Sequence, residues 1–78
     1  MKHSHYFKPC PYKSIDIYRI LLMYEVTDPC IQHAIKKLLV AGGRGAKDEY
    51  KDVTEAIDTL NRWQNMRIEE IDRNINPD

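Results

Sequence analysis

The sequence predicts an all-α protein: a three-helix domain with an extended N-terminal arm and a long C-terminal helix, assembled as a homo-oligomer. Three observations predict this class. Apolar residues recur at three- and four-residue steps in three segments of the 78-residue chain. Prolines and glycines separate these segments. The third segment is too long for the other two to cover. We divide the chain into an arm, residues 1–13, and a single helical domain, residues 14–78.

The arm is expected to be extended, because Pro9 and Pro11 each exclude the preceding residue from a helix. Three aromatic side chains are available to pack it against the helices: Tyr6, Phe7 and Tyr12.

We expect the first helix to begin at Ser14, which is a good N-cap, with Asp16 in its first turn. The second helix should begin at Pro29, with Asp28 as its N-cap. Gly42 or Gly43 should end the second helix in the left-handed conformation. One face of each helix is apolar: Ile17, Ile20, Leu21 and Tyr24 in the first, and Ile31, Ala34, Ile35, Leu38 and Leu39 in the second.

The third helix is predicted from about Lys47 to beyond Ile71, which makes it roughly 35–45 Å long. Its core stripe is Val53, Ala56, Ile57, Leu60 and Trp63. Its C-terminal half carries further apolar residues that the short helices cannot reach: Met66, Ile68, Ile71 and Ile75. Exposing such a stripe to water is costly, so it predicts self-association; a frayed tail after Trp63 is the alternative.

The composition of the chain argues against several classes of function. Twelve basic side chains balance twelve acidic ones, which argues against non-specific DNA binding. The longest apolar run has five residues, far short of a membrane span, and no signal peptide is visible. The two cysteines do not make a disulfide framework, so we expect reduced thiols in the cytoplasm.

The segment around the glycine turn is the best candidate for a ligand site. Consecutive glycines can point several backbone N–H groups into one concavity, and nearby lysines and an arginine would supply the charge that a phosphate needs. The candidate ligand-binding residues are Lys36, Lys37, Gly42, Gly43, Arg44, Gly45, Lys47 and Tyr50. Asp48 and Glu49 argue against this interpretation, since their carboxylates already balance the positive end of the dipole of the third helix. A tight helix–helix turn with solvated lysines is the alternative.

Two further sets of residues are candidates for binding a metal ion. Four carboxylates at three-residue steps, Glu49, Asp52, Glu55 and Asp58, are similar in spacing to the magnesium ligands of all-helical nucleotide pyrophosphohydrolases. The other helices offer no second acidic pair, so a solvated face is the simpler reading. Cys30 and His33 share a helix face, and His5 or Cys10 would have to complete a zinc site, but the spacings match no zinc finger. We assign no catalytic residue, metal ligand or cofactor.

Parts of the chain resemble a family of small bacteriophage proteins, some of them labelled phage nucleotide kinase-like. The resemblance covers about residues 5–66 and is carried by these segments: His5-Tyr6, Ile15-Asp16-Ile17-Tyr18, HAIKKLL at 33–39, the glycine turn, Asp52-Val53 and Glu55-Ala56. The chain departs from the family at Lys37, Val40 and Glu55, where relatives often have an aromatic residue, an arginine and a basic residue.

The resemblance implies a phage or prophage origin and cytoplasmic action in a host cell. Our leading hypothesis is a protein that binds a phosphate-bearing ligand, a nucleotide or a nucleotide immune signal, without catalysis, and so counters host defence. Two alternatives stay open: an inhibitor or adaptor that docks on a host protein, and a magnesium-dependent nucleotide enzyme.

Overall fold

The computed structural model describes residues 6–43 and 45–75, without the side chains of Ala46 and Lys47. It contains three α-helices in chain order: α1, Ile17–Met23; α2, Pro29–Leu39; and α3, Ala46–Ile75. The all-α prediction with a long C-terminal helix is therefore confirmed.

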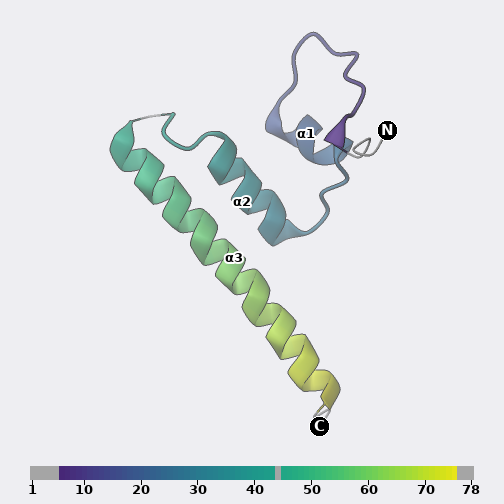
Figure 1. Cartoon of the computed structure of the whole chain (residues 1–78), viewed down its shortest axis with the longest axis vertical. Helices are drawn as coiled ribbons and strands as arrows, with labels where there is room; N and C mark the ends of the chain where they lie inside the picture. Colours follow the sequence, from purple (N-terminus) through teal and green to yellow (C-terminus); the bar gives the residue numbers. More distant parts are fainter. Residues whose placement is uncertain (1–5, 44, 76–78) are drawn as a thin grey trace.

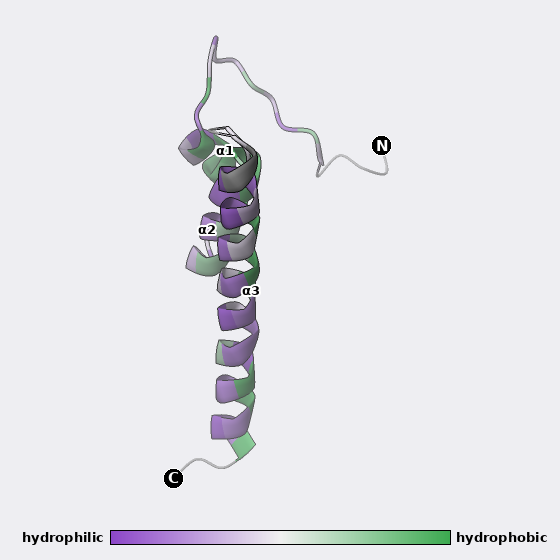
Figure 2. Cartoon of the chain, turned by 90° about the vertical axis from the view of Figure 1, so that its left-hand side faces the viewer, coloured by the Kyte–Doolittle hydropathy of each residue, from purple (hydrophilic) through white to green (hydrophobic). Residues whose placement is uncertain are grey.

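The three helices lie side by side, with α2 between the other two (Figure 1). α2 runs antiparallel to α3 and packs against its N-terminal half, and α1 packs against α2. Among the described residues, α1 makes no packing contact with α3. In the edge-on view of Figure 2 the helices overlap in one layer, and hydrophobic residues follow one side of α3.

This arrangement is extended for its size. The radius of gyration is 16.4 Å, whereas a compact domain of 78 residues has one of about 11.5 Å. The difference arises because α3 has 30 residues and α2 only 11, so α2 covers about a third of the length of α3.

The core is correspondingly small. Its buried hydrophobic residues are Leu21, Ala34 and Ala56, one from each helix. No large side chain is fully buried among the described residues. We expected Leu38, Leu39 and Ile57 to face the core, but about half of each side chain is exposed. Their apolar periodicity is real, yet the described residues form no second layer of helices to cover them.

Helix α1 begins later than predicted. Its N-cap is Asp16, whose Oδ1 accepts a hydrogen bond from the Arg19 N–H at 2.9 Å, and not Ser14. The helix has seven residues because a C-cap motif stops it. The N–H of Val26 bonds to the carbonyl of Leu21 and that of Glu25 to Leu22, the paired bonds of a Schellman motif.

The start of α2 was predicted correctly. Asp28 Oδ1 accepts from the N–H groups of Cys30 at 2.8 Å and Ile31 at 3.0 Å, and Pro29 occupies the first turn. The end was not: α2 stops at Leu39 with Val40 as C-cap, before the glycines. Gly42 does take the left-handed conformation, at φ +80°, but as part of the turn that follows.

Two contacts attach the arm to α1: one through Tyr24 at the end of the helix, and one through the arm's own Tyr12. The Tyr24 hydroxyl donates to the Tyr6 carbonyl at 2.6 Å, and the Lys8 ammonium lies 5.8 Å from the centre of the Tyr24 ring. Arg19 stacks over Tyr12, 4.6 Å from its ring centre. Tyr6 and Phe7 themselves remain largely exposed.

Glu25 is the one non-glycine residue with a positive φ, 56°, within the described ranges. A side chain in this conformation costs about 1–2 kcal/mol, and glycine avoids that cost. We therefore expect Glu25→Gly to raise the free energy of unfolding by about 1 kcal/mol, allowing for the greater chain entropy of glycine in the unfolded state. Urea unfolding checks this against Glu25→Ala, which keeps the backbone cost. Equal stabilities for the two variants would contradict it.

Candidate functional site

The clearest concave surface among the described residues is a groove between α1 and α2, with a volume of about 590 Å³. The C-cap motif of α1 reverses the chain at this point, so that Leu21 and Val26 form the apolar part of the groove. Gln32 holds the reversal in place, since its Nε2 donates to the Val26 carbonyl at 2.8 Å. The groove therefore has a defined apolar wall.

Polar side chains from both helices line the same groove. Tyr18 comes from α1, and His33 and Lys36 come from α2. The Lys36 ammonium lies 5.0 Å from the centre of the Tyr18 ring, within the range of a cation–π interaction. His33 and Lys36 are three residues apart, which places them on one face of the helix. A cation, an imidazole and an aromatic ring thus meet at this groove.

A second hollow, of about 300 Å³, lies at the C-terminal end of α2. His33 and Lys36 line it as well, together with Lys37, Ile17 and Val40. Among the described residues, no carboxylate lines either hollow. Two of the predicted site residues, Lys36 and Lys37, therefore line the second hollow, whereas Lys36 alone also lines the groove.

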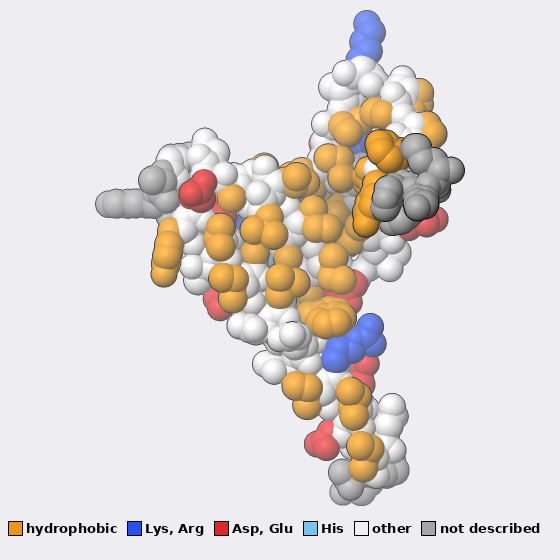
Figure 3. Space-filling view, viewed as in Figure 1, with side chains coloured by type: hydrophobic (Ala, Val, Ile, Leu, Met, Phe, Trp, Pro, Cys, Tyr) orange, Lys and Arg blue, Asp and Glu red, His pale blue; other side chains and the backbone are white. Residues whose placement is uncertain are grey.

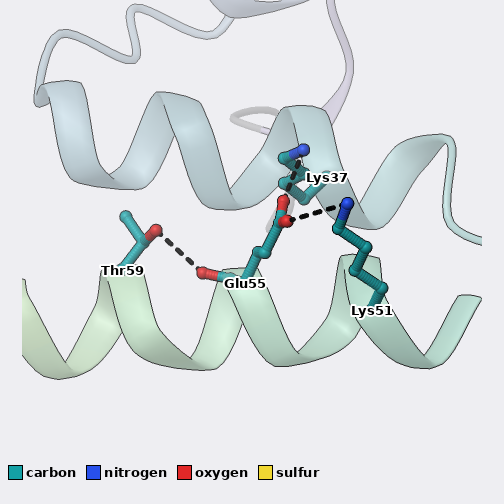
Figure 4. A network of polar contacts seen from close by, with 4 residues as sticks. All are labelled: Lys37, Lys51, Glu55 and Thr59. Atoms are coloured by element: carbon teal, nitrogen blue, oxygen red, sulfur yellow. Dashed lines mark hydrogen bonds and ion pairs between the residues drawn. The ribbon is translucent and has the colours of Figure 1, made fainter. Parts of the chain in front are cut away.

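Lys37 also faces α3. Its ammonium pairs with Glu55 Oε2 at 2.5 Å, and Lys51 Nζ lies 4.0 Å from the other carboxylate oxygen (Figure 4). The Thr59 hydroxyl donates to the Glu55 backbone carbonyl at 2.8 Å. The Lys37–Glu55 pair joins α2 to α3, whereas the other two contacts lie within α3, so Lys37 has a structural role beside any role in binding.

The glycine turn is organised by its own backbone. The Gly43 N–H donates to the Val40 carbonyl at 3.0 Å and the Gly45 N–H to the Gly42 carbonyl at 3.2 Å. These two N–H groups are engaged within the turn and do not converge on an outside anion. The Glu49 carboxylate lies against Gly42, where an added Cβ would be 2.8 Å from its Oε2. The described part of the turn therefore places a negative group where we expected a phosphate.

Tyr50 is among the predicted residues that do not line the groove. Arg44 and the Lys47 side chain lie outside the described residues. Tyr50 is 79% exposed on α3. A phosphate site at the glycine turn consequently stays a prediction.

The four regularly spaced carboxylates have separate environments. Asp52 is buried, Glu55 pairs with Lys37, Glu49 lies on Gly42 and Asp58 is exposed. Over residues 6–43 and 45–75, no three His, Cys, Asp or Glu side chains gather closely enough to hold a metal ion. Lys51 lies 4.0 Å from Glu55 on the same helix, and Arg62 pairs with Glu69 at 2.9 Å.

Comparison with protein families, curated proteins and solved structures finds no match to this chain. The resemblance to small phage proteins therefore stays a prediction. None of the helices, as far as the structure describes them, has the length and apolar character needed to cross a membrane.

Sequence reasoning missed His33 and Tyr18 as residues that line this groove. His33 was considered as a zinc ligand beside Cys30. Its three-residue spacing from Lys36 was a usable signal, because that spacing puts both side chains on one helix face. Tyr18 had no such signal, since only the packing of α1 on α2 brings it to Lys36.

The Lys37–Glu55 contact predicts a pH dependence of stability. The hydrogen bond from Lys37 is the largest of the causes that hold the pKa of Glu55 below its ordinary value of 4.5. Burial opposes it, and the charges of Lys37, Lys51 and His33 add smaller lowering effects. A carboxylate with a lowered pKa stabilises the folded state above its ordinary pKa, and that contribution is lost as the pH falls through the folded pKa.

We therefore expect Glu55→Gln to be less stable than the wild type at pH 7, and we expect this deficit to be smaller at about pH 3. Urea unfolding at one fixed protein concentration measures the difference. Asp58→Asn, an exposed carboxylate on the same helix, serves as the control and should show no such convergence. A deficit for Glu55→Gln that is the same at both pH values would contradict the role of the ionised carboxylate.

Proposed function

We propose that this chain is a non-catalytic binding protein whose α1–α2 groove holds a small phosphate-bearing ligand with a planar ring, such as a nucleotide. The observation that carries the proposal is the lining of the groove. Lys36, His33 and the Tyr18 ring share one concave surface, without a carboxylate among the described lining residues.

Each part of the groove matches a part of such a ligand. An ammonium group binds phosphate oxygens through charge-assisted hydrogen bonds, and an imidazole N–H can add another. The exposed Tyr18 ring offers a face for stacking a base. Leu21, Val26 and Pro29 supply the apolar contact that most small-molecule sites have.

Lys37 extends this positive surface into the second hollow. Its ammonium is shared with Glu55, so it contributes less free charge than Lys36. A ligand with more than one phosphate would reach from the Lys36 ammonium towards Lys37. The proposal therefore favours diphosphates, triphosphates and cyclic dinucleotides over monophosphates.

We propose binding without catalysis because the described residues bring no set of reactive side chains together. The carboxylates that a magnesium-dependent enzyme would need are dispersed among buried, paired and exposed positions. A phage protein of this kind would sequester a host nucleotide or a nucleotide immune signal and so counter host defence.

A second candidate function is an adaptor that docks on a host protein through its arm. The exposed aromatic rings of Tyr6 and Phe7 favour it, since large exposed aromatic side chains are typical of interface anchors. Phe7→Ser separates the two functions: it should abolish adaptor binding and leave nucleotide binding unchanged.

Isothermal titration tests the leading proposal, with nucleoside mono-, di- and triphosphates and cyclic dinucleotides as ligands. We expect uptake of at least one of them, and at least tenfold weaker binding by Lys36→Met, because a hydrogen bond to a charged group contributes about 1.5–3 kcal/mol. Lys51→Met is the matched control: Lys51 is an exposed lysine on α3 and does not line the groove.

Tyr18→Leu should also weaken binding of a ligand with a base, whereas Tyr50→Leu should not, since Tyr50 lies on α3 away from the groove. No heat with any ligand of the panel would overturn the proposal. So would equal affinities of the wild type and Lys36→Met.

A further inference from the structure

The surface of this chain is too large for a compact monomer. A folded monomer of 9.2 kDa exposes about 4,900 Å², and this chain exposes 6746 Å². Even if the nine residues outside the described ranges are given the area of an unfolded chain, roughly 650–700 Å² of excess remains. A standard protein interface buries about 800 Å² on each partner.

An apolar part of the exposed surface lies on one face of α3. Ile57, Leu60, Ile68, Ile71 and Ile75 follow one side of α3, and each is between 39% and 70% exposed. Steps of three and four residues keep them on one stripe, about 130° from the stripe that packs on α2. We call these five residues the α3 stripe.

The stripe continues onto α2. Leu38 and Leu39 are about half exposed, and in Figure 3 hydrophobic side chains spread over the facing side of α2 and α3 and continue down the C-terminal half of α3. A single exposed leucine is ordinary, but a contiguous face over two antiparallel helices marks an interaction surface.

We infer that this face binds the same face of a second copy, with the two α3 helices antiparallel across a two-fold axis near residue 66. Two helical hairpins that share apolar faces make a four-helix arrangement, which is a stable way to bury such stripes. The C-terminal half of each α3, which α2 does not cover, would then lie along the other copy.

Two of the five positions of the stripe are exchanged by this symmetry. Ile57 and Ile75 lie nine residues on either side of residue 66, so each meets the other in the partner. An isologous contact requires this kind of exchange, in which one residue meets a second and the second meets the first.

Charge selects the antiparallel direction. Residues 46–60 carry five acidic and two basic side chains, whereas residues 61–75 carry three of each. A parallel pair would place the two acidic halves side by side, where like charges repel. An antiparallel pair places each acidic half beside a neutral half and also opposes the two helix dipoles.

Analytical ultracentrifugation of the full chain tests the association. We expect a mass of two chains at tens of micromolar and a thermal unfolding midpoint that rises with protein concentration, since a dimer follows mass action. A single-chain mass of 9.2 kDa with a concentration-independent midpoint overturns the inference. A mass above two chains overturns it too.

Ile71→Glu should weaken the dimer at least a hundredfold, because it removes two buried isoleucine side chains per dimer, one from each copy. Asn65→Glu puts the same charge on the same helix, on its polar side, and should change the dissociation constant less than threefold. Equal effects of the two substitutions would count against the stripe as the contact surface.

Cross-linking tests the direction. In a background with Cys10 and Cys30 replaced by serine, a short bis-maleimide should link Gln64→Cys between copies, because this position lies near the axis. It should not link Tyr50→Cys, which an antiparallel pair places far from its counterpart. Linkage at Tyr50→Cys, or at neither position, overturns the antiparallel arrangement.

Discussion

The packing of α2 against α3 is the contact on which the rest of this structure depends. The most buried residues of these two helices are alanines, Ala34 and Ala56, and small side chains let two helices approach closely. The Lys37–Glu55 pair and the glycine turn fix the relative position of the helices along their axes. Within the described ranges, α1 packs on α2 and not on α3, and the arm is joined to α1 through the Tyr24 and Arg19 side chains.

Most of the fold was open to prediction from local signals. Helix periodicity, the Asp28 cap with Pro29, and the left-handed Gly42 are all set by neighbouring residues, so the sequence alone indicated them correctly. Ser14 and Asp16 are both good caps, and sequence reasoning chose the wrong one. Burial of Leu38, Leu39 and Ile57 could not be predicted, because an apolar stripe does not reveal whether its own chain or another chain covers it.

The candidate site was only partly predictable for a geometric reason. Lys36 and Lys37 are neighbours in the sequence, but consecutive residues on a helix point about 100° apart. Lys36 therefore faces α1 and the Tyr18 ring, while Lys37 reaches Glu55 on α3. The two lysines are neighbours in the sequence, yet their side chains lie on different faces of α2. His33, three residues before Lys36, lies on the same face as Lys36.

α2 consequently has three faces with different contacts. The proposed ligand groove and the proposed dimer contact lie on different faces of this helix. His33 and Lys36 face α1, Ala34 and Lys37 face α3, and Leu38 and Leu39 belong to the apolar face. The packing of α1 on α2, which forms the groove, is weaker than the packing of α2 on α3, because α1 has seven residues and one buried side chain, Leu21.

A ligand between Tyr18 and Lys36 would bridge α1 and α2 and so stabilise their packing. Its apparent affinity is reduced by the fraction of molecules in which α1 is undocked. Changes that stabilise the α1–α2 turn should then tighten binding without touching the ligand, whereas changes in the apolar face should alter assembly and leave the groove intact.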